Sequence, residues 1–119
     1  MSEQLKKKVS SPLKMGSLIV NSRVLQSPLA GVTDLAFRKL VRRYSPNSMI
    51  YTEMFNATSL CHLREAQQFI DVDIEQKPIG IRIFDSRYFF MVEAAQKIEN
   101  QGAQTIDINM GCPVNKITK

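Results

Sequence analysis

Strand-like and helix-like segments alternate along this 119-residue chain, and that alternation limits the folds open to it. The clearest strand runs from Pro78 to Phe84, where the isoleucines at 79, 81 and 83 alternate with other residues. A last strand is predicted from Thr105 to Met110. The remaining strands are predicted at 18–20 and 23–29, joined by a turn at 21–22, and at 49–54.

Three helices are predicted between these strands. The first follows Thr33 and Asp34, which can accept the free amide hydrogens of a first helical turn, and it ends before Pro46. The second spans residues 58–70, and the third spans about 87–101, with Gly102 as its stop. The apolar faces expected to point inward are Phe37, Leu40, Val41 and Tyr44; Leu63, Ala66 and Ile70; and Tyr88, Met91, Ala95 and Ile98.

This order of elements predicts an α/β fold with a parallel sheet and right-handed connections. Such a sheet is either open and doubly wound or part of a (β/α)8 barrel. No Gly-x-Gly-x-x-Gly follows the first strand, which disfavours the open dinucleotide-binding sheet. A full TIM barrel takes about 250 residues, so about four parallel strands here predict its N-terminal half. Residues 1–17 are expected to form a basic polar tail, and 18–119 the half-barrel.

Charge and composition exclude several classes of protein. The net charge is +5, and the 44% of apolar residues is too high for a disordered chain. Lys6 to Lys8 contribute to a basic N-terminus that is compatible with an RNA partner, although solvated charge is the simpler interpretation. No apolar run approaches the roughly 18 residues of a membrane span, and no signal peptide begins the chain. Two cysteines favour a reducing, cytoplasmic setting without disulfides.

Strand alternation indicates which polar side chains would face the barrel interior. If the isoleucines of residues 78–84 face the helices, Arg82 faces inward, as do Asp107 and Asn109 of the last strand. Arg82, Asn109 and Cys112 then converge at the C-terminal mouth, where barrel enzymes have their active sites. Glu53 lies near the end of the strand predicted at 49–54 and could join these residues at the mouth, but its facing is ambiguous from the sequence.

Cysteine and small residues offer further candidates. Cys112 follows a strand in a Gly-Cys-Pro turn, where its thiol could act as a general acid, could be activated as a nucleophile, or could simply be buried. Pro28 to Gly31 would let a flat ligand approach the backbone, or form an ordinary loop. Cys61 and His62 have no partners at metal-ligand spacing, so packing is the simpler interpretation, and no metal site is predicted. Arg42 and Arg43 are expected to be solvated.

Three segments resemble the tRNA-dihydrouridine synthases, most closely the bacterial B subgroup. They are Pro28 to Asp34 with Phe37-Arg38, Thr52 to Met54, and Asp107 to Pro113 followed by Lys116. The resemblance covers about residues 18–119. It implies an FMN-linked oxidoreductase of the TIM-barrel type with a helical C-terminal domain, which reduces the C5=C6 bond of uridines in tRNA while NADPH reduces the flavin.

The resemblance also assigns roles to individual residues. It implies hydride transfer from flavin N5 to C6 of the uridine and protonation of C5 by Cys112 as general acid. Asn109 would lie near both the flavin and the target base, and Lys116 would contact the substrate. The flavin would be touched through the backbone of Pro28, Leu29 and Ala30.

Arg82 departs from the family pattern, which usually has a flavin-contacting Gln on that strand. An arginine has donors and no acceptor. It could donate to a flavin carbonyl, stabilise negative charge on reduced flavin, or weaken flavin binding. The family's remaining flavin and substrate groups, including a strand-five Lys, a His and the phosphate loops, belong to the second half of the barrel. The isolated 119-residue chain is therefore expected to bind FMN weakly and to be inactive.

Two other functions fit the sequence. One is a different FMN barrel that acts on a free pyrimidine, as in a dihydroorotate dehydrogenase-like enzyme. The other is a non-catalytic RNA-binding remnant that uses the basic tail. The Gly-Cys-Pro turn directly after Asn109 favours the tRNA enzyme over the first alternative.

Overall fold

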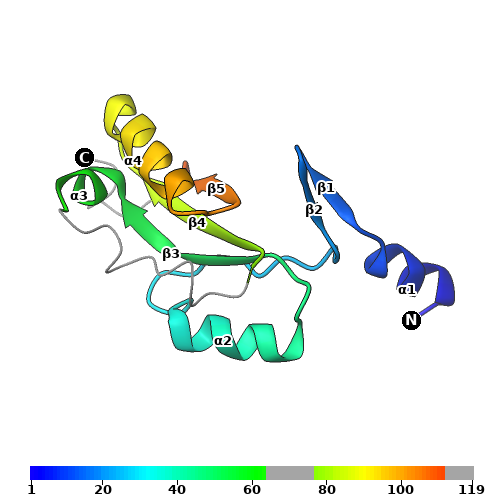
Figure 1. Ribbon diagram of the computed structural model, residues 1–119. Helices are drawn as coiled ribbons and strands as arrows, with labels where there is room; N and C mark the ends of the chain where they lie inside the picture. Colours follow the sequence, from blue (N-terminus) through cyan, green and yellow to red (C-terminus); the bar gives the residue numbers. More distant parts are fainter. Residues whose placement is uncertain (64–76, 112–119) are drawn as a thin grey trace.

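A three-stranded parallel sheet carries the fold in the computed structural model, which describes residues 1–63 and 77–111 (Figure 1). Its strands are β3 (Ile50–Asn56), β4 (Ile79–Phe84) and β5 (Thr105–Ile108). They lie side by side in chain order, and both pairs are parallel. The α/β class and the parallel sheet predicted from the sequence are therefore confirmed.

The hydrophobic core lies between this sheet and two helices, α3 (Ala57–His62) and α4 (Tyr88–Asn100). The alternating isoleucines of β4 are fully buried there, packed with Leu60 of α3 and Ile98 of α4. The predicted facing of β4 is therefore correct. The opposite face of the strand carries Gly80 and Arg82, which keeps the polar side chains of the sheet away from the core.

The N-terminal segment differs from the predicted tail and strand pair. It contains α1 (Glu3–Ser10) and an antiparallel hairpin of β1 (Leu13–Met15) and β2 (Leu18–Val20), which Figure 1 shows to one side of the parallel sheet. Gly16, with φ of 61°, makes the tight turn that sends β2 back along β1. The strand predicted at 23–29 is reduced to one parallel bridge between Leu25 and Met49.

Helix α2 (Leu35–Tyr44) begins as predicted but buries a different face. The Asp34 carboxylate accepts a hydrogen bond of 2.8 Å from the Phe37 amide, which is an N-cap. Leu40 and Tyr44, expected to be inside, are 54% and 79% exposed. Apolar spacing alone failed here because the groups that need partners beneath this helix are backbone carbonyls.

Arginine side chains satisfy those carbonyls. Arg42, expected to be solvated, is only 4% exposed. One of its terminal nitrogens donates to the carbonyls of Pro46 and Ser48 at 2.8 and 2.7 Å, and the other to that of Pro78 at 2.9 Å. Because guanidinium has five donors in a fixed plane, one side chain can join the chain segments before β3 and β4.

Helices α3 and α4 pack against each other at a partly buried cysteine. The Cys61 thiol donates to the Phe90 carbonyl at 3.5 Å, and Lys97 donates to the Cys61 carbonyl at 2.9 Å. Burial raises the pKa of the Cys61 thiol, and the nearby Glu93 carboxylate raises it further. This cysteine therefore packs, as the sequence suggested.

The bounds of α3 and α4 can be compared with the helices predicted at 58–70 and about 87–101. Helix α4 stops where predicted, since Gly102 has a positive φ of 91°. Tyr88 was expected inside but is 81% exposed. Helix α3 ends at His62, and Leu63 is outside it; the rest of the predicted second helix, with Ala66 and Ile70, lies outside the described residues.

Candidate active site at the ends of the parallel strands

A cavity of about 250 Å³ opens where the loop after residue 25 meets the ends of β3, β4 and β5. The five residues expected at a flavin, four by the family resemblance and Arg82 in place of the family's Gln, line it together with Met54 and Gly111. The lining residues are Pro28, Leu29, Ala30, Met54, Arg82, Asn109 and Gly111.

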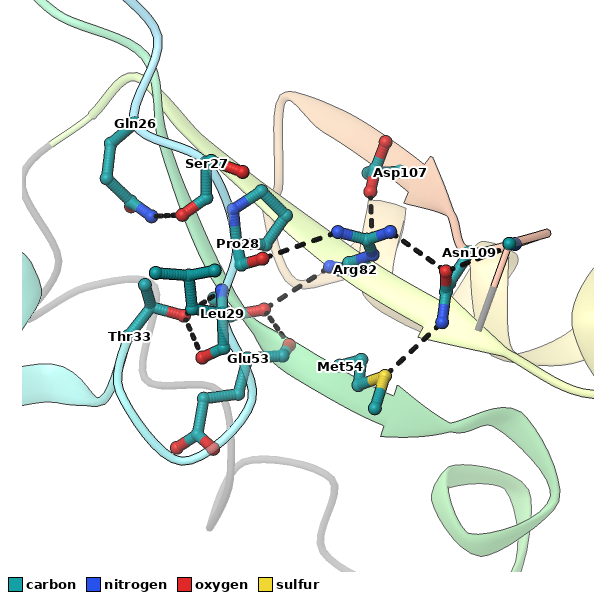
Figure 2. Close-up of polar contacts among 12 residues, drawn as sticks. Gln26, Ser27, Pro28, Leu29, Thr33, Glu53, Met54, Arg82, Asp107 and Asn109 are labelled. Atoms are coloured by element: carbon teal, nitrogen blue, oxygen red, sulfur yellow. Dashed lines mark hydrogen bonds and ion pairs between the residues drawn. The ribbon is translucent and has the colours of Figure 1, made fainter. Parts of the chain in front are cut away.

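Arg82 lies at the centre of this arrangement, as Figure 2 shows, and holds groups from two other segments. One terminal nitrogen donates to the Asn109 side-chain oxygen at 2.9 Å, and the other to the Pro28 carbonyl at 3.4 Å. Its Nε lies 3.1 Å from a carboxylate oxygen of Asp107. That contact is an ion pair without hydrogen-bond geometry at the buried Nε. The guanidinium thus ties β4, β5 and the Pro28 loop together.

The side-chain amide of Asn109 is oriented by its neighbours. Its Oδ1 accepts from Arg82 and, at 3.4 Å, from the Gly111 amide. Its Nδ2 donates to the Met54 sulfur at 3.3 Å, a weak acceptor. The Asn109 backbone amide donates to the Ile83 carbonyl at 2.9 Å and so continues the pairing of β5 with β4. The carbonyl end of this side chain is therefore engaged within the protein.

The loop that forms one wall of the cavity is braced from within. Thr33 is fully buried, and its hydroxyl bonds both the amide and the carbonyl of Leu29, at 3.1 and 3.0 Å. Gly31 has a φ of 71°, which favours glycine, and its amide donates to a Glu53 carboxylate oxygen at 2.7 Å. Glu53 was a possible member of the polar mouth; in the structure it supports this loop, and Met54 lines the cavity.

A second polar cluster, which the sequence analysis did not predict, joins the segments that follow β3 and β4. The Asp85 side chain is 3% exposed and accepts hydrogen bonds from Asn56, from the amide and hydroxyl of Thr58, and from Arg87. Burial by itself would raise the pKa of Asp85, but the hydrogen bonds from Thr58 and Arg87 hold it well below its usual range. In the sequence, the one sign of this cluster is an aspartate directly after a predicted strand.

Cys112 and Lys116 lie outside the described residues. Gly111, the residue before Cys112, lines the cavity. Within residues 1–63 and 77–111, no group of three or more His, Cys, Asp and Glu side chains could hold a metal ion. No helix in that same part of the chain is long and apolar enough to cross a membrane.

Comparison with known proteins identifies the family. The family model described as "Dihydrouridine synthase (Dus)" matches residues 25–119. The chain is 62% identical over 110 residues to a protein of Synechocystis named "Probable tRNA-dihydrouridine synthase 1", covering 92% of this chain and 31% of that protein. It is 34% identical over 107 residues to "tRNA-dihydrouridine synthase B" of Pseudomonas aeruginosa, covering 90% and 32%. The chain thus spans about a third of the length of these relatives. It belongs to the dihydrouridine synthase family.

Proposed function

We propose that this chain is the N-terminal part of a cytoplasmic tRNA-dihydrouridine synthase, which reduces the C5=C6 bond of uridines in tRNA with FMN as cofactor and NADPH as reductant. The observation that carries the proposal is the cavity at the strand ends, lined by the residues that the family motifs supply. The names of the relatives give the substrate class, and the net charge of +5 suits an RNA partner.

For the fold, we propose that residues 18–119 supply the first part of a (β/α)8 barrel that is followed by a helical domain. Parallel strands in chain order, with α3 and α4 packed on the core face, support a barrel. The opposite face carries Gly80, where a Cβ would collide with the Tyr51 ring and the Thr105 hydroxyl. That crowding is expected on the concave side of a closing sheet.

The residues around the cavity suit a flavin ring. An isoalloxazine is flat and carries carbonyl oxygens and ring nitrogens that accept hydrogen bonds, while the Asn109 Nδ2, beside Arg82, supplies a donor. The wall formed by Pro28, Leu29 and Ala30 offers small or apolar contacts. The Leu29 backbone is bonded to Thr33 and the Pro28 carbonyl to Arg82, so this stretch of backbone is fixed where it would lie against the ring.

The protein's own groups divide the chemistry between them. FMN, when bound, supplies the hydride that adds to the pyrimidine ring. Asn109 presents an N–H donor on the cavity side and can hold a carbonyl of the flavin or of the base. A thiol in water has a pKa of about 8.5 and is mostly protonated at neutral pH, so the Cys112 side chain is of a type that can deliver a proton to C5 as general acid. Lys116 contacts the substrate.

The test uses the protein made from its complete gene, loaded with FMN and given NADPH and a tRNA transcript. Mass spectrometry of the digested tRNA should show uridines that have gained two hydrogens. A matched reaction with free uracil or orotate in place of tRNA is the control. Conversion of the free pyrimidine with unchanged tRNA would instead support the free-pyrimidine oxidoreductase. Binding of tRNA without any reduction would support a non-catalytic RNA-binding protein.

The short chain has its own expected behaviour. We expect isolated residues 1–119 to bind FMN weakly, because Asn109 and the Pro28 loop, tied together by Arg82, would contact only one side of the ring system. Desalting should strip flavin colour from this polypeptide. Stoichiometric flavin retained by it would overturn this expectation.

A further inference from the structure

We propose that Arg82 is a positioning residue that fixes the Asn109 side chain in one of its two amide orientations, with Nδ2 available to the ligand and Asp107 as counter-ion. The identity of the ligand as a flavin rests on the proposed function, whereas the orientation of Asn109 does not. This role differs from a direct contact between Arg82 and the cofactor, because here Arg82 acts through a second residue.

The argument begins with the hydrogen-bonding capacity of the two side chains. An asparagine amide has a carbonyl oxygen and an NH₂ group of nearly the same shape, so its neighbours decide which end faces which way. Arg82 has donors only, and one of them lies 2.9 Å from Oδ1 of Asn109. Turning the amide over would place two donors against each other and leave the guanidinium donor without its acceptor.

Other contacts around Asn109 reinforce the same orientation. The Gly111 amide, a second donor, also points at Oδ1. On the other side, Nδ2 has the Met54 sulfur as its described partner, and a thioether is a weak acceptor that a ligand oxygen can outcompete. One of the two Nδ2 hydrogens has no partner among the described residues. The Asn109 side chain therefore presents donors to the cavity.

Strand register explains why Arg82 stays in place. Arg82 of β4 pairs directly with Asp107 of β5 in the parallel ladder, so the two side chains emerge side by side on the face opposite the core. The ion pair of 3.1 Å holds the guanidinium along this face, where 26% of the arginine side chain is exposed. The hydrogen bond from Arg82 to the Pro28 carbonyl then connects β4 to the loop that forms the other wall of the cavity.

A glutamine at this position would behave differently. Its amide offers both a donor and an acceptor, so it could pair with either orientation of Asn109. Arginine removes that choice and makes this wall of the cavity a donor surface. The ligand group that it selects is an acceptor, such as a carbonyl oxygen or a deprotonated ring nitrogen.

The first test observes Asn109 directly, in the ¹⁵N-labelled full-length protein. In the wild type, the Asn109 side-chain amide should give one sharp pair of resonances. Arg82→Gln should shift or broaden them, and Arg82→Lys, which keeps donors only, should largely restore them. Arg43→Gln, a matched change at an exposed arginine of α2, should leave them unaltered. Unchanged Asn109 resonances in folded Arg82→Gln would overturn the proposal.

The second test is a double-mutant cycle with FMN affinity as the readout. Arg82→Gln should weaken FMN binding about tenfold, as expected for loss of a charged hydrogen bond. In an Asn109→Ala background, the same substitution should cost about twofold or less, because its target is gone. Equal losses in both backgrounds would mean that Arg82 acts on the flavin directly and would overturn the positioning role. A wild-type protein that binds no FMN would contradict the proposed function, while the resonance test would still decide the orientation of Asn109.

Discussion

The Glu53 carboxylate of β3 accepts a hydrogen bond from the backbone amide of Gly31, 22 residues earlier, at 2.7 Å. This bond holds a loop residue with a positive φ against β3, the first strand of the parallel sheet. An acidic side chain next to a candidate active site is therefore a support for the loop and not one of the cavity-lining groups.

Replacing Glu53 should loosen the wall of the cavity. Glu53→Ala removes a charge-assisted hydrogen bond of about 1 kcal/mol, so the FMN affinity of the full-length protein should fall about fivefold. Glu53→Gln keeps an acceptor oxygen and should lie between Ala and wild type. Flavin fluorescence titration measures the change, and Glu99→Ala at the exposed end of α4 is the control. Wild-type affinity in Glu53→Ala would contradict the supporting role.

Asp85 should make stability depend on pH. Because the folded-state pKa of its carboxyl is lowered, the charged form stabilises the fold above the ordinary pKa of 3.8. That contribution is lost as the pH falls below this value toward the folded-state pKa. Asp85→Asn should lower the free energy of unfolding by about 2 kcal/mol near pH 7. The difference from wild type, measured by urea denaturation, should shrink below about pH 4; a difference that grows there would refute this assignment.

Arg42 should be far more sensitive to substitution than its neighbour. Arg42→Met preserves much of the side-chain volume but leaves the buried carbonyl of Ser48 and the part-buried contacts to Pro46 and Pro78 without this donor. The free energy of unfolding should fall by about 3 kcal/mol. Arg43→Met, on the exposed side of the same helix, should change it by less than about 0.5 kcal/mol. Thermal or urea unfolding compares the two, and similar losses would argue against the carbonyl clamp.

Cys112 should be needed for turnover and not for cofactor binding. In the full-length protein, Cys112→Ala should slow uridine reduction about 10²- to 10⁴-fold, the usual contribution of a general acid. The bound FMN spectrum should be unchanged. Cys61→Ala, the matched change at the packed cysteine, should leave turnover near wild type. Full activity of Cys112→Ala would exclude the acid role.

Sequence reasoning succeeded where side-chain alternation was strong. The alternating isoleucines of β4 predicted its two faces, and with them the position of Arg82 on the face opposite the core. The same logic placed Asn109 on that face, where it contacts Arg82. Motif resemblance named four of the residues that line the cavity, Pro28, Leu29, Ala30 and Asn109, and assigned no role to Met54 or Gly111. Cys112 and Lys116 remain predictions.

Sequence reasoning failed where hydrogen bonds to the backbone, rather than apolar spacing, determined the packing. Helix α2 turned Arg42 inward because carbonyls beneath it needed donors, and Leu40 became exposed as a result. Residues 18–20 paired backward with β1 through the turn at Gly16, because a local hairpin was available. The Asp85 cluster depends on loops brought together only by the finished sheet, so no local pattern in the sequence marked it.

The packing of Cys61 between α3 and α4 has a practical consequence for chemical labelling. Alkylating reagents attack thiolates, and the raised pKa of Cys61 keeps it in the slow-reacting thiol form at neutral pH. The chain has only one other cysteine, Cys112. A brief treatment with a limiting amount of iodoacetamide can therefore probe Cys112 by peptide mass with little competition from Cys61 and without first mutating that residue.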